Sequence, residues 1–381
     1  MVARQEPSET KATNIAFNGK FLTASPTGVH RVADELIKAY CRLNAEKSGL
    51  QRHVLSVAAP KNIRRSPAYE GAPVVRRGVL TWQFWEQIDL PFLTKNELLI
   101  NVCNLGPIAR TFAITMMHDA QIYSNPASYS FGFRNWYKIV WRLIGRRHDK
   151  IITVSEFSKQ ELIRRGIVAP ENISVVPNGV DHVLDTPADT SIVQRLGLNL
   201  CQFVLGLANT QEHKNISHLL KVFSDERMSH FTLVLVGRAT AEDFVRDGHT
   251  VPKNVVFVGT ISDGEFRALM ERALCLAFPS LTEGFGLPPL EAMLLGCPAV
   301  VSPCGALPEV CGEAAIYAEP HDIEPWIAAI RRLDSDKLQY AHLRDEARRH
   351  ASGYTWSRSA QILDRVITDA LERRGRDSRI P

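Results

Sequence analysis

Two α/β domains, each a parallel β-sheet covered by helices on both faces, form the architecture that this sequence predicts. With 381 residues, the chain is long enough for two domains that each bury a core of their own. In the second half, short continuous apolar runs alternate with helical stretches, which is typical of parallel strands buried on both faces. The strands expected there lie at 203–207, 231–236, 255–258, 275–278, 299–301 and 315–317, and the clearest helices lie at 216–223, 265–273 and 326–333.

The first half follows the same alternation. Strands are expected at 14–18, 53–58, 97–102, 112–117, 150–154 and 173–176, with a helix after the first strand and another that Ser155 caps. The turn Pro177-Asn178-Gly179 follows the last of these strands and is expected to end the first domain. We therefore expect domains at 1–178 and 179–355. The remainder, 356–381, is expected to hold most of an amphipathic helix over 354–371 and a loose charged tail.

The composition argues against several classes of protein. A formal net charge of +4 is too small to indicate nucleic-acid binding. No apolar run approaches the length of a membrane span, and the first residues lack the apolar core of a signal peptide. The seven scattered cysteines show neither a disulfide framework nor zinc-ligand spacing. A cytoplasmic location is expected.

The most informative stretch is 279–296, PSLTEGFGLPPLEAMLLG, which follows a strand and leads into a helix. Glycines in the loop allow the backbone to approach a ligand, and the helix start offers N–H groups to an anion. Two carboxylates flank that position, Glu283 in the loop and Glu291, which is expected in the first helical turn. Carboxylates accept hydrogen bonds from sugar hydroxyls rather than binding phosphate. A purely structural role, with Glu291 complementing the helix dipole, explains Glu291 but not Glu283 with its glycines and the two prolines.

Three further positions have the chemistry of a ligand site. Gly28 lies where the first helix begins after the first strand, a geometry that suits phosphate approach. His118 follows a buried strand, and ligands of open α/β sheets bind beyond the carboxyl ends of strands. Lys214 stands near a helix start and offers a point charge to a diphosphate, although an exposed lysine without a ligand is the simpler interpretation. An aromatic cluster at 82–85 either packs into the core or lines an acceptor groove.

One helix has two contrasting faces. In 133–147 the aliphatic and aromatic side chains fall on one face, whereas Arg134, Lys138, Arg142 and Arg146 recur every fourth residue on another. This pattern fits either a core helix with a solvated basic back or a helix between Arg134 and Arg147 that contacts an anionic membrane.

These motifs resemble one family of enzymes. Glu283-Gly-Phe-Gly-Leu-Pro-x-x-Glu291 is similar to the paired-glutamate motif of retaining glycosyltransferases of family 4, and PTGVHR, MMHD, IITVSEFS, VVPNGVD and HKN occur in that family's order. The resemblance implies the GT-B fold, in which two doubly wound Rossmann-like domains face each other across a cleft. It assigns the acceptor to the first domain and a nucleotide sugar to the second, and it implies that the final helix crosses back to the first domain.

The resemblance also implies the site residues. Catalytic roles fall to His118, Glu283 and Lys214, and donor binding to the following group: Gly28, Asn209, His213, Gly284, Phe285, Gly286, Leu287 and Glu291. Family members usually carry arginine where Asn209 stands and often where His213 stands, so Lys214 is left with fewer cations beside it. No metal ligands are expected, because no Asp-x-Asp pair follows a strand.

The implied reaction moves a hexose from a nucleoside diphosphate sugar to a glycan or lipid-linked acceptor, with retention and without a metal. The amino-terminal motif is most similar to enzymes of bacterial surface-polysaccharide synthesis, which favours mannose or a related sugar and GDP-mannose as co-substrate, at the inner face of the plasma membrane. Two alternatives stay open. One is a nucleotide-sugar epimerase of the same architecture, and the other is a catalytically silent nucleotide-sugar-binding protein.

Overall fold

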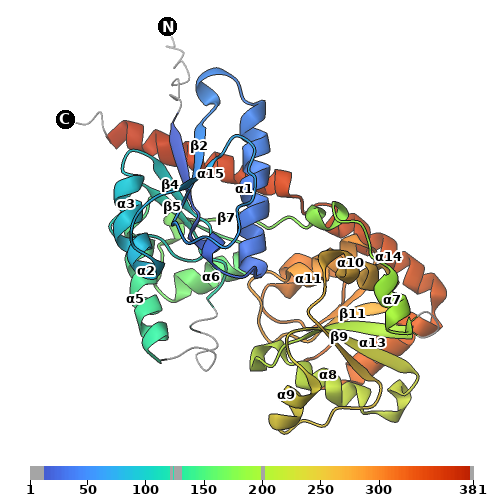
Figure 1. The fold of residues 1–381 in the computed structure, drawn as a ribbon. Helices are drawn as coiled ribbons and strands as arrows, with labels where there is room; N and C mark the ends of the chain where they lie inside the picture. The colour runs from blue at the N-terminus through green and yellow to red at the C-terminus, as the bar shows by residue number, and fades with distance from the viewer. Residues whose placement is uncertain (1–12, 121–122, 124–130, 199–201, 378–381) are drawn as a thin grey trace. The chain divides into compact units, whose positions relative to one another are not determined.

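The computed structural model describes residues 13–120, 123, 131–198 and 202–377, which form two compact units (Figure 1). Unit 1 contains most of the chain up to Asn178 together with the residues from Trp356 onward. Unit 2 is built mainly from the residues between Gly179 and Thr355. Each unit has one parallel sheet between helices, so the prediction of two Rossmann-like domains is confirmed.

The described part of unit 1 contains a seven-stranded sheet in the order β3-β2-β1-β4-β5-β6-β7, and every pair in it is parallel. Its strands are β1 (Asn14–Asn18), β2 (Val54–Ala59), β3 (Val74–Arg76), β4 (Leu98–Asn101), β5 (Ala113–Met116), β6 (Lys150–Thr153) and β7 (Ile173–Val175). The strand order reverses between β1 and β4. In open α/β sheets, ligands bind outside the carboxyl ends of the strands at such a reversal.

The helices of unit 1 are α1 (Gly28–Glu46), α2 (Trp82–Phe84), α3 (Leu90–Leu93), α5 (Phe131–Arg147), α6 (Glu156–Arg164) and α15 (Trp356–Asp377), and a π-helical turn, η3 (Trp85–Asp89), joins α2 to α3. The apolar stripe of α1 places Leu36, Ile37 and Tyr40 in the core, and α1 packs along α15. Ser155 caps α6 as expected, since its side chain accepts a hydrogen bond from the Ser158 N–H.

In unit 2, the described residues form a six-stranded parallel sheet in the order β10-β9-β8-β11-β12-β13. Its strands are β8 (Gln202–Ala208), β9 (Phe231–Gly237), β10 (Val255–Gly259), β11 (Cys275–Phe278), β12 (Ala299–Val301) and β13 (Ile316–Tyr317). Its α-helices are α7 (Ser191–Arg195), α8 (Ile216–Phe223), α9 (Ala241–Arg246), α10 (Asp263–Arg272), α11 (Leu287–Leu294), α12 (Leu307–Cys311), α13 (Ile323–Ser335) and α14 (Lys337–Ala351). The order reverses between β8 and β11, so a ligand is expected beyond the ends of these two strands.

Several details differ from the expectation. The final helix continues to Asp377, so the loose tail expected from Glu372 is mostly helical, and the residues after Asp377 lie outside the described part. The aromatic cluster is divided, because Trp85 is fully buried whereas Trp82 and Phe84 are exposed. Among the described residues, no helix is long and apolar enough to cross a membrane.

Candidate active site

Lys214 and Glu283 meet beyond the carboxyl ends of β8 and β11. Lys214 ends a 3₁₀ turn, η8 (Glu212–Lys214), that follows β8, and Glu283 lies in the loop after β11. The Lys214 Nζ donates a hydrogen bond of 2.7 Å to Oε1 of Glu283. The carboxylate is buried and the ammonium is partly accessible. A lysine and a glutamate separated by 69 residues thus form one charged pair at the place where this sheet would bind a ligand.

The backbone around this pair fixes the loop on two sides. The Leu281 N–H donates to the His213 carbonyl at 2.7 Å, and the Ala306 N–H donates to the Glu283 carbonyl at 3.0 Å. A Cβ at Gly305 would lie 2.5 Å from the Glu283 nitrogen, so a side chain there would displace the loop. The loop is therefore a positioned element, with the Glu283 side chain directed at Lys214.

The next helix, α11, begins at Leu287 with an open amino terminus. Gly286 precedes it with φ of 97°, a left-handed conformation that favours glycine, and no side chain of the described residues caps the helix. Such a terminus carries N–H groups and a positive dipole end, both suited to an anion. The neighbouring Gly284 and Phe285 are buried, and Phe285 makes an edge-to-face contact with Tyr354 at 5.9 Å.

Glu291 does not lie in the first turn of that helix, so this expectation is wrong. Because α11 begins at Leu287, one residue before the first proline, Glu291 is its fifth residue and belongs to the second turn. Its Oε1 lies 3.2 Å from Nε2 of His182, and both side chains are buried. His182 is a candidate site residue that the sequence reasoning missed, although it directly follows the PNGVD motif.

Neither residue in the two positions that lack arginine supplies a cation. His213 is buried, and neither of its ring nitrogens hydrogen-bonds to any described residue. Burial lowers the pKa of His213, the nearby Lys214 lowers it further, and Glu283 opposes both. Asn209 follows β8, and its Oδ1 accepts a hydrogen bond of 2.8 Å from the Gln211 N–H. Lys214 is therefore the cation of this segment.

In unit 1, His118 is held as a neutral imidazole beyond the end of β5. Its Nε2 lies 2.9 Å from the Val102 carbonyl, which can only accept, so Nε2 carries the proton and Nδ1 is an acceptor. Its backbone N–H donates to Oδ1 of Asn104 at 2.8 Å, and Asn104 itself has φ of 59°. Burial lowers the pKa of His118 to about 4; the Val102 contact opposes this, and His30 contributes to the lowering.

Gly28 is the first residue of α1 and is exposed. A Cβ built there would contact nothing within 4 Å, so packing among the described residues does not require glycine. In the same helical turn, Nδ1 of His30 lies 3.0 Å from the Ser25 carbonyl and donates to it, which leaves its Nε2 as an acceptor.

The structure therefore brings the candidate residues together in two sets. Unit 2 joins Lys214, His213 and Glu283 around one loop, and unit 1 holds His118 near the start of α1. Among the described residues, no group of three or more His, Cys, Asp or Glu side chains could hold a metal ion.

Comparison with known proteins identifies relatives of both units. A family model described as glycosyl transferases group 1 matches residues 201–350, and one described as glycosyltransferase family 4 matches residues 26–184. The chain is 31% identical over 254 residues to MMP alpha-(1->4)-mannosyltransferase of Mycolicibacterium hassiacum, covering 63% of this chain and 59% of that protein. It is 28% identical over 235 residues to the O-antigen chain mannosyltransferase RfbU of Salmonella typhimurium, covering 60% and 62%. It is also 28% identical over 240 residues to the mannosyltransferase WbdA of Escherichia coli, covering 59% of this chain and only 29% of WbdA.

Solved structures match the fold along nearly the whole chain. Anabaena HepE in complex with UDP-glucose matches with a TM-score of 0.71 at 20% identity, covering 94% of this chain and all of HepE. WaaG, a glycosyltransferase involved in lipopolysaccharide biosynthesis, matches with a TM-score of 0.69 at 15% identity, covering 93% of this chain and 99% of WaaG. At these identities the likeness concerns the fold.

Proposed function

We propose that this chain transfers a hexose from a nucleoside diphosphate sugar to a glycan or lipid-linked acceptor with retention. The proposal follows from its family, since the chain belongs to the group 1 and family 4 glycosyltransferases of GT-B fold. Mannose or a related sugar, with GDP-mannose as donor, is favoured by the mannosyltransferases among its relatives. The product would be part of a polysaccharide. No cofactor is needed for such a transfer.

The observation that carries this proposal is the Lys214–Glu283 pair in front of α11. The main chemical demand of the reaction is to stabilise negative charge on the departing diphosphate. Lys214 and the amino terminus of α11 together offer a cation and N–H groups for that charge. When the donor binds, Lys214 would exchange its carboxylate partner for phosphate, which would free Glu283 to accept hydrogen bonds from the sugar hydroxyls.

The other candidate residues take supporting roles in the proposal. Glu291 would hold the ribose diol, and Gly28 and the neutral His118 would face the phosphates and the donor sugar. An uncharged His118 suits contact with a hydroxyl, because its Nδ1 accepts a hydrogen bond without adding positive charge beside the reacting carbon. The leaving phosphate itself would take the acceptor proton on the same face, so no protein nucleophile is required.

A lipid-linked acceptor is supported by the surface of unit 1. The exposed face of α5 alternates apolar and cationic side chains, namely Ile139, Arg142, Leu143 and Arg146, while its buried face contributes Val140, Trp141 and Ile144 to the core. Another exposed apolar group lies in 79–92 and consists of Val79, Trp82, Phe84, Ile88 and Phe92. Mixed apolar and basic surfaces suit the interface of an anionic bilayer. The Arg134 side chain lies outside the described part.

The decisive experiment supplies labelled GDP-, UDP-, dTDP- and ADP-sugars with a mixture of glycan and lipid-linked acceptors, after a thermal-shift screen has ranked donor binding. We expect one donor to give a glycosylated acceptor with the anomeric configuration of the donor, in the presence of excess EDTA. A free epimerised sugar without acceptor product would instead assign the chain to the epimerases. Binding without any turnover would assign it to the silent nucleotide-sugar-binding proteins, which the uncharged Asn209 and His213 favour.

A further inference from the structure

Unit 1 contains a cavity of about 170 Å³ at the point where its strand order reverses. The side chains that line it come from the end of β1, from the 3₁₀ turn after β1, from the loop after β4, from α1 and from the π-helical turn. They include Lys20, Phe21, Thr23, Glu86 and Leu105. Because ligands of doubly wound sheets bind outside the carboxyl ends of the strands at this reversal, the cavity lies where a ligand is expected.

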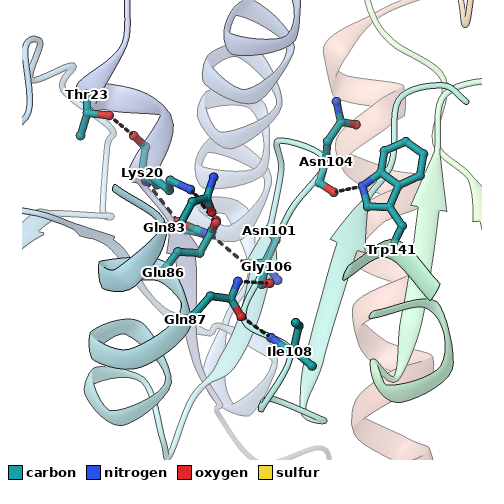
Figure 2. Close-up of polar contacts among 11 residues, drawn as sticks. Lys20, Thr23, Gln83, Glu86, Gln87, Asn101, Asn104, Gly106, Ile108 and Trp141 are labelled. Atoms are coloured by element: carbon teal, nitrogen blue, oxygen red, sulfur yellow. Dashed lines mark hydrogen bonds and ion pairs between the residues drawn. The ribbon is translucent and has the colours of Figure 1, made fainter. Parts of the chain in front are cut away.

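An ion pair with a buried carboxylate forms one wall of the cavity. The Lys20 Nζ donates to Oε2 of Glu86 at 2.7 Å and to Oε1 of Gln83 at 2.8 Å (Figure 2). The Glu86 side chain is 3% exposed and the Lys20 side chain is 20% exposed. A buried ion pair is weak evidence of stabilisation, because its desolvation cost offsets its attraction and an apolar pair would serve the fold as well.

The carboxylate of that pair is anchored by a chain of buried amides. Asn18 donates to Oε1 of Glu86 at 2.8 Å and to Oδ1 of Asn101 at 3.0 Å. Asn101 in turn donates to the Thr115 hydroxyl at 2.9 Å, and that hydroxyl lies 2.7 Å from Nδ1 of His148. These side chains cross the centre of the sheet, where apolar residues would normally pack. Their hydrogen bonds therefore hold Glu86 in one position at the cavity wall.

The helix that presents Glu86 is itself unusual. Glu86 and Gln87 belong to the π-helical turn η3, and such turns are rare and frequent at functional sites. Gln87 fixes the turn to the loop after β4, since its Nε2 donates to the Gly106 carbonyl at 3.0 Å and its Oε1 accepts from the Ile108 N–H at 2.9 Å (Figure 2). The turn thus directs polar side chains inward although Trp85 beside them packs in the core.

The chemistry of the walls selects a neutral hydroxylated ligand. The Lys20–Glu86 pair has no net charge, so an anion would meet the carboxylate and a cation would meet the ammonium. The pair still offers the third N–H of Lys20 and further lone pairs on Glu86, and Nε2 of His30 adds an acceptor. Hydroxyl groups can use all of these at once. Phe21 and Leu105 supply apolar surface for the C–H face of a ring.

We propose that this cavity binds a hydroxylated sugar ring of the acceptor through the Lys20–Glu86 pair. The proposal rests on the proposed function, because it identifies the sugar as part of the acceptor. It adds a subsite within unit 1 that is formed by the Lys20–Glu86 pair, with Thr23 on its lining.

The test uses the full chain and saturation-transfer NMR with methyl α-mannopyranoside, methyl α-glucopyranoside and methyl α-galactopyranoside, in the presence of saturating nucleoside diphosphate. At least one glycoside is expected to bind, and Lys20→Met is expected to weaken that binding at least tenfold. The matched control is Lys38→Met, since Lys38 forms a similar pair with Glu35 at 2.7 Å on α1 but does not line the cavity. If Lys20→Met fails to fold, Thr23→Val changes the lining without removing a charge.

The proposal is overturned if no glycoside of the panel binds or if Lys20→Met binds it as the wild type does. Nucleoside diphosphate affinity is expected to be unchanged in Lys20→Met, and a loss there would also overturn an acceptor-only role. Absence of transfer from every donor would refute the proposed function. Glycoside binding that is lost only in the cavity variants would still support the cavity.

Discussion

Each unit places a lysine–glutamate pair at the reversal point of its sheet, but the two pairs are held differently. Lys20–Glu86 in unit 1 and Lys214–Glu283 in unit 2 both have an N–O distance of 2.7 Å. In unit 1 the carboxylate also accepts from Asn18, which the buried amide chain keeps in place. In unit 2, Lys214 is the side chain seen to bond Glu283, and the loop is fixed through its backbone.

The difference indicates which pair can exchange partners. Separating Lys20 from Glu86 would leave the buried Glu86 carboxylate without its cation, which is costly. Separating Lys214 from Glu283 costs less when a phosphate replaces the carboxylate and sugar hydroxyls replace the ammonium. We therefore expect the pair of unit 2 to open on donor binding and the pair of unit 1 to stay closed.

The largest effect is expected from Glu283→Gln. Transfer should fall on the order of a hundredfold or more, because two charge-assisted hydrogen bonds to the donor sugar, about 1.5–3 kcal/mol each, are weakened. Nucleoside diphosphate affinity should be kept or increased, since Lys214 no longer has a carboxylate partner. Steady-state kinetics and calorimetry measure the two effects. The control is Glu271→Gln, which removes a surface pair with Arg267 in the same unit. Near-normal turnover would remove Glu283 from the site.

Lys214→Ala should weaken nucleoside diphosphate binding by roughly ten- to hundredfold, the equivalent of about 1.5–3 kcal/mol for one charge-assisted bond. Calorimetry with Lys221→Ala on α8 as control measures the change. His213 sharpens the test, because burial and Lys214 lower its pKa and a bound diphosphate would raise it. Affinity should then decrease as pH rises through the bound-state pKa, except in His213→Ala. Unchanged binding by Lys214→Ala would show that backbone N–H groups hold the phosphates.

The sequence predicted the sheets well because their strands are continuous apolar runs. The strands expected at 275–278 and 299–301 have the same first and last residues as β11 and β12. Helix α14 was not anticipated, since its sequence is mostly polar and its fully buried positions are the small Ala347 and Ala351. Strand β3 was also not anticipated, because its three residues are too few to show an alternation of apolar and polar side chains.

The sequence indicated which residues belong to the candidate site, but not which of them contact one another. The motif indicated Glu283 and Lys214 separately, but a 69-residue separation hides their contact until the sheet brings β8 and β11 together. The same holds for Glu86, which meets Asn18 and Asn101 only through the fold. The two prolines indicated the start of the helix, which placed Glu291 in the first turn. The helix instead begins at Leu287, before the prolines.

A third prediction concerns the stability of unit 1 at low pH. Burial lowers the pKa of both His118 and His148 to about 4; hydrogen bonds to Val102 and Pro107 oppose this, and His30, Arg110 and Arg147 assist it. Below about pH 6.5 the unfolded chain binds protons that these folded imidazoles do not, so stability falls as pH falls. At pH 5 the loss is about 2 kcal/mol for each histidine.

That loss corresponds to a decrease in the melting temperature of unit 1 on the order of 10 °C between pH 7 and pH 5. Differential scanning calorimetry of the wild type and of His148→Gln measures it, and the variant should lose about half of the pH dependence. His342→Gln, which changes an exposed histidine of unit 2, is the control. An unchanged pH dependence in His148→Gln would contradict a neutral histidine at the end of the amide chain.

The smallest effect per substituted residue is expected for membrane binding, because many weak contacts together provide its affinity. Exposed large apolar residues of unit 2, such as Val245 and Leu338, are widely separated in the chain, whereas unit 1 gathers them in 79–92 and on α5 beside cations. Both segments are tied to the loop after β4, through Gln87 to Gly106 and through Trp141 to the Asn104 carbonyl at 2.9 Å (Figure 2). We therefore expect cosedimentation with phosphatidylcholine vesicles that contain phosphatidylglycerol and much weaker binding to phosphatidylcholine alone.

Arg142→Ala and Arg146→Ala should each weaken that vesicle binding about fivefold, the equivalent of about 1 kcal/mol per cation near an anionic surface. Trp82→Ser with Phe84→Ser should weaken binding further by removing apolar side chains from the interface, and Leu338→Ser should have no effect.

Trp82 has φ of 58°, which is unfavourable for a large side chain. Its replacement by glycine should therefore reduce vesicle binding without lowering the melting temperature. Equal binding to both vesicle types would show that Arg142 and Arg146 do not contribute to membrane binding. Concentration-dependent dimers that do not bind vesicles would assign this surface to a second copy of the chain.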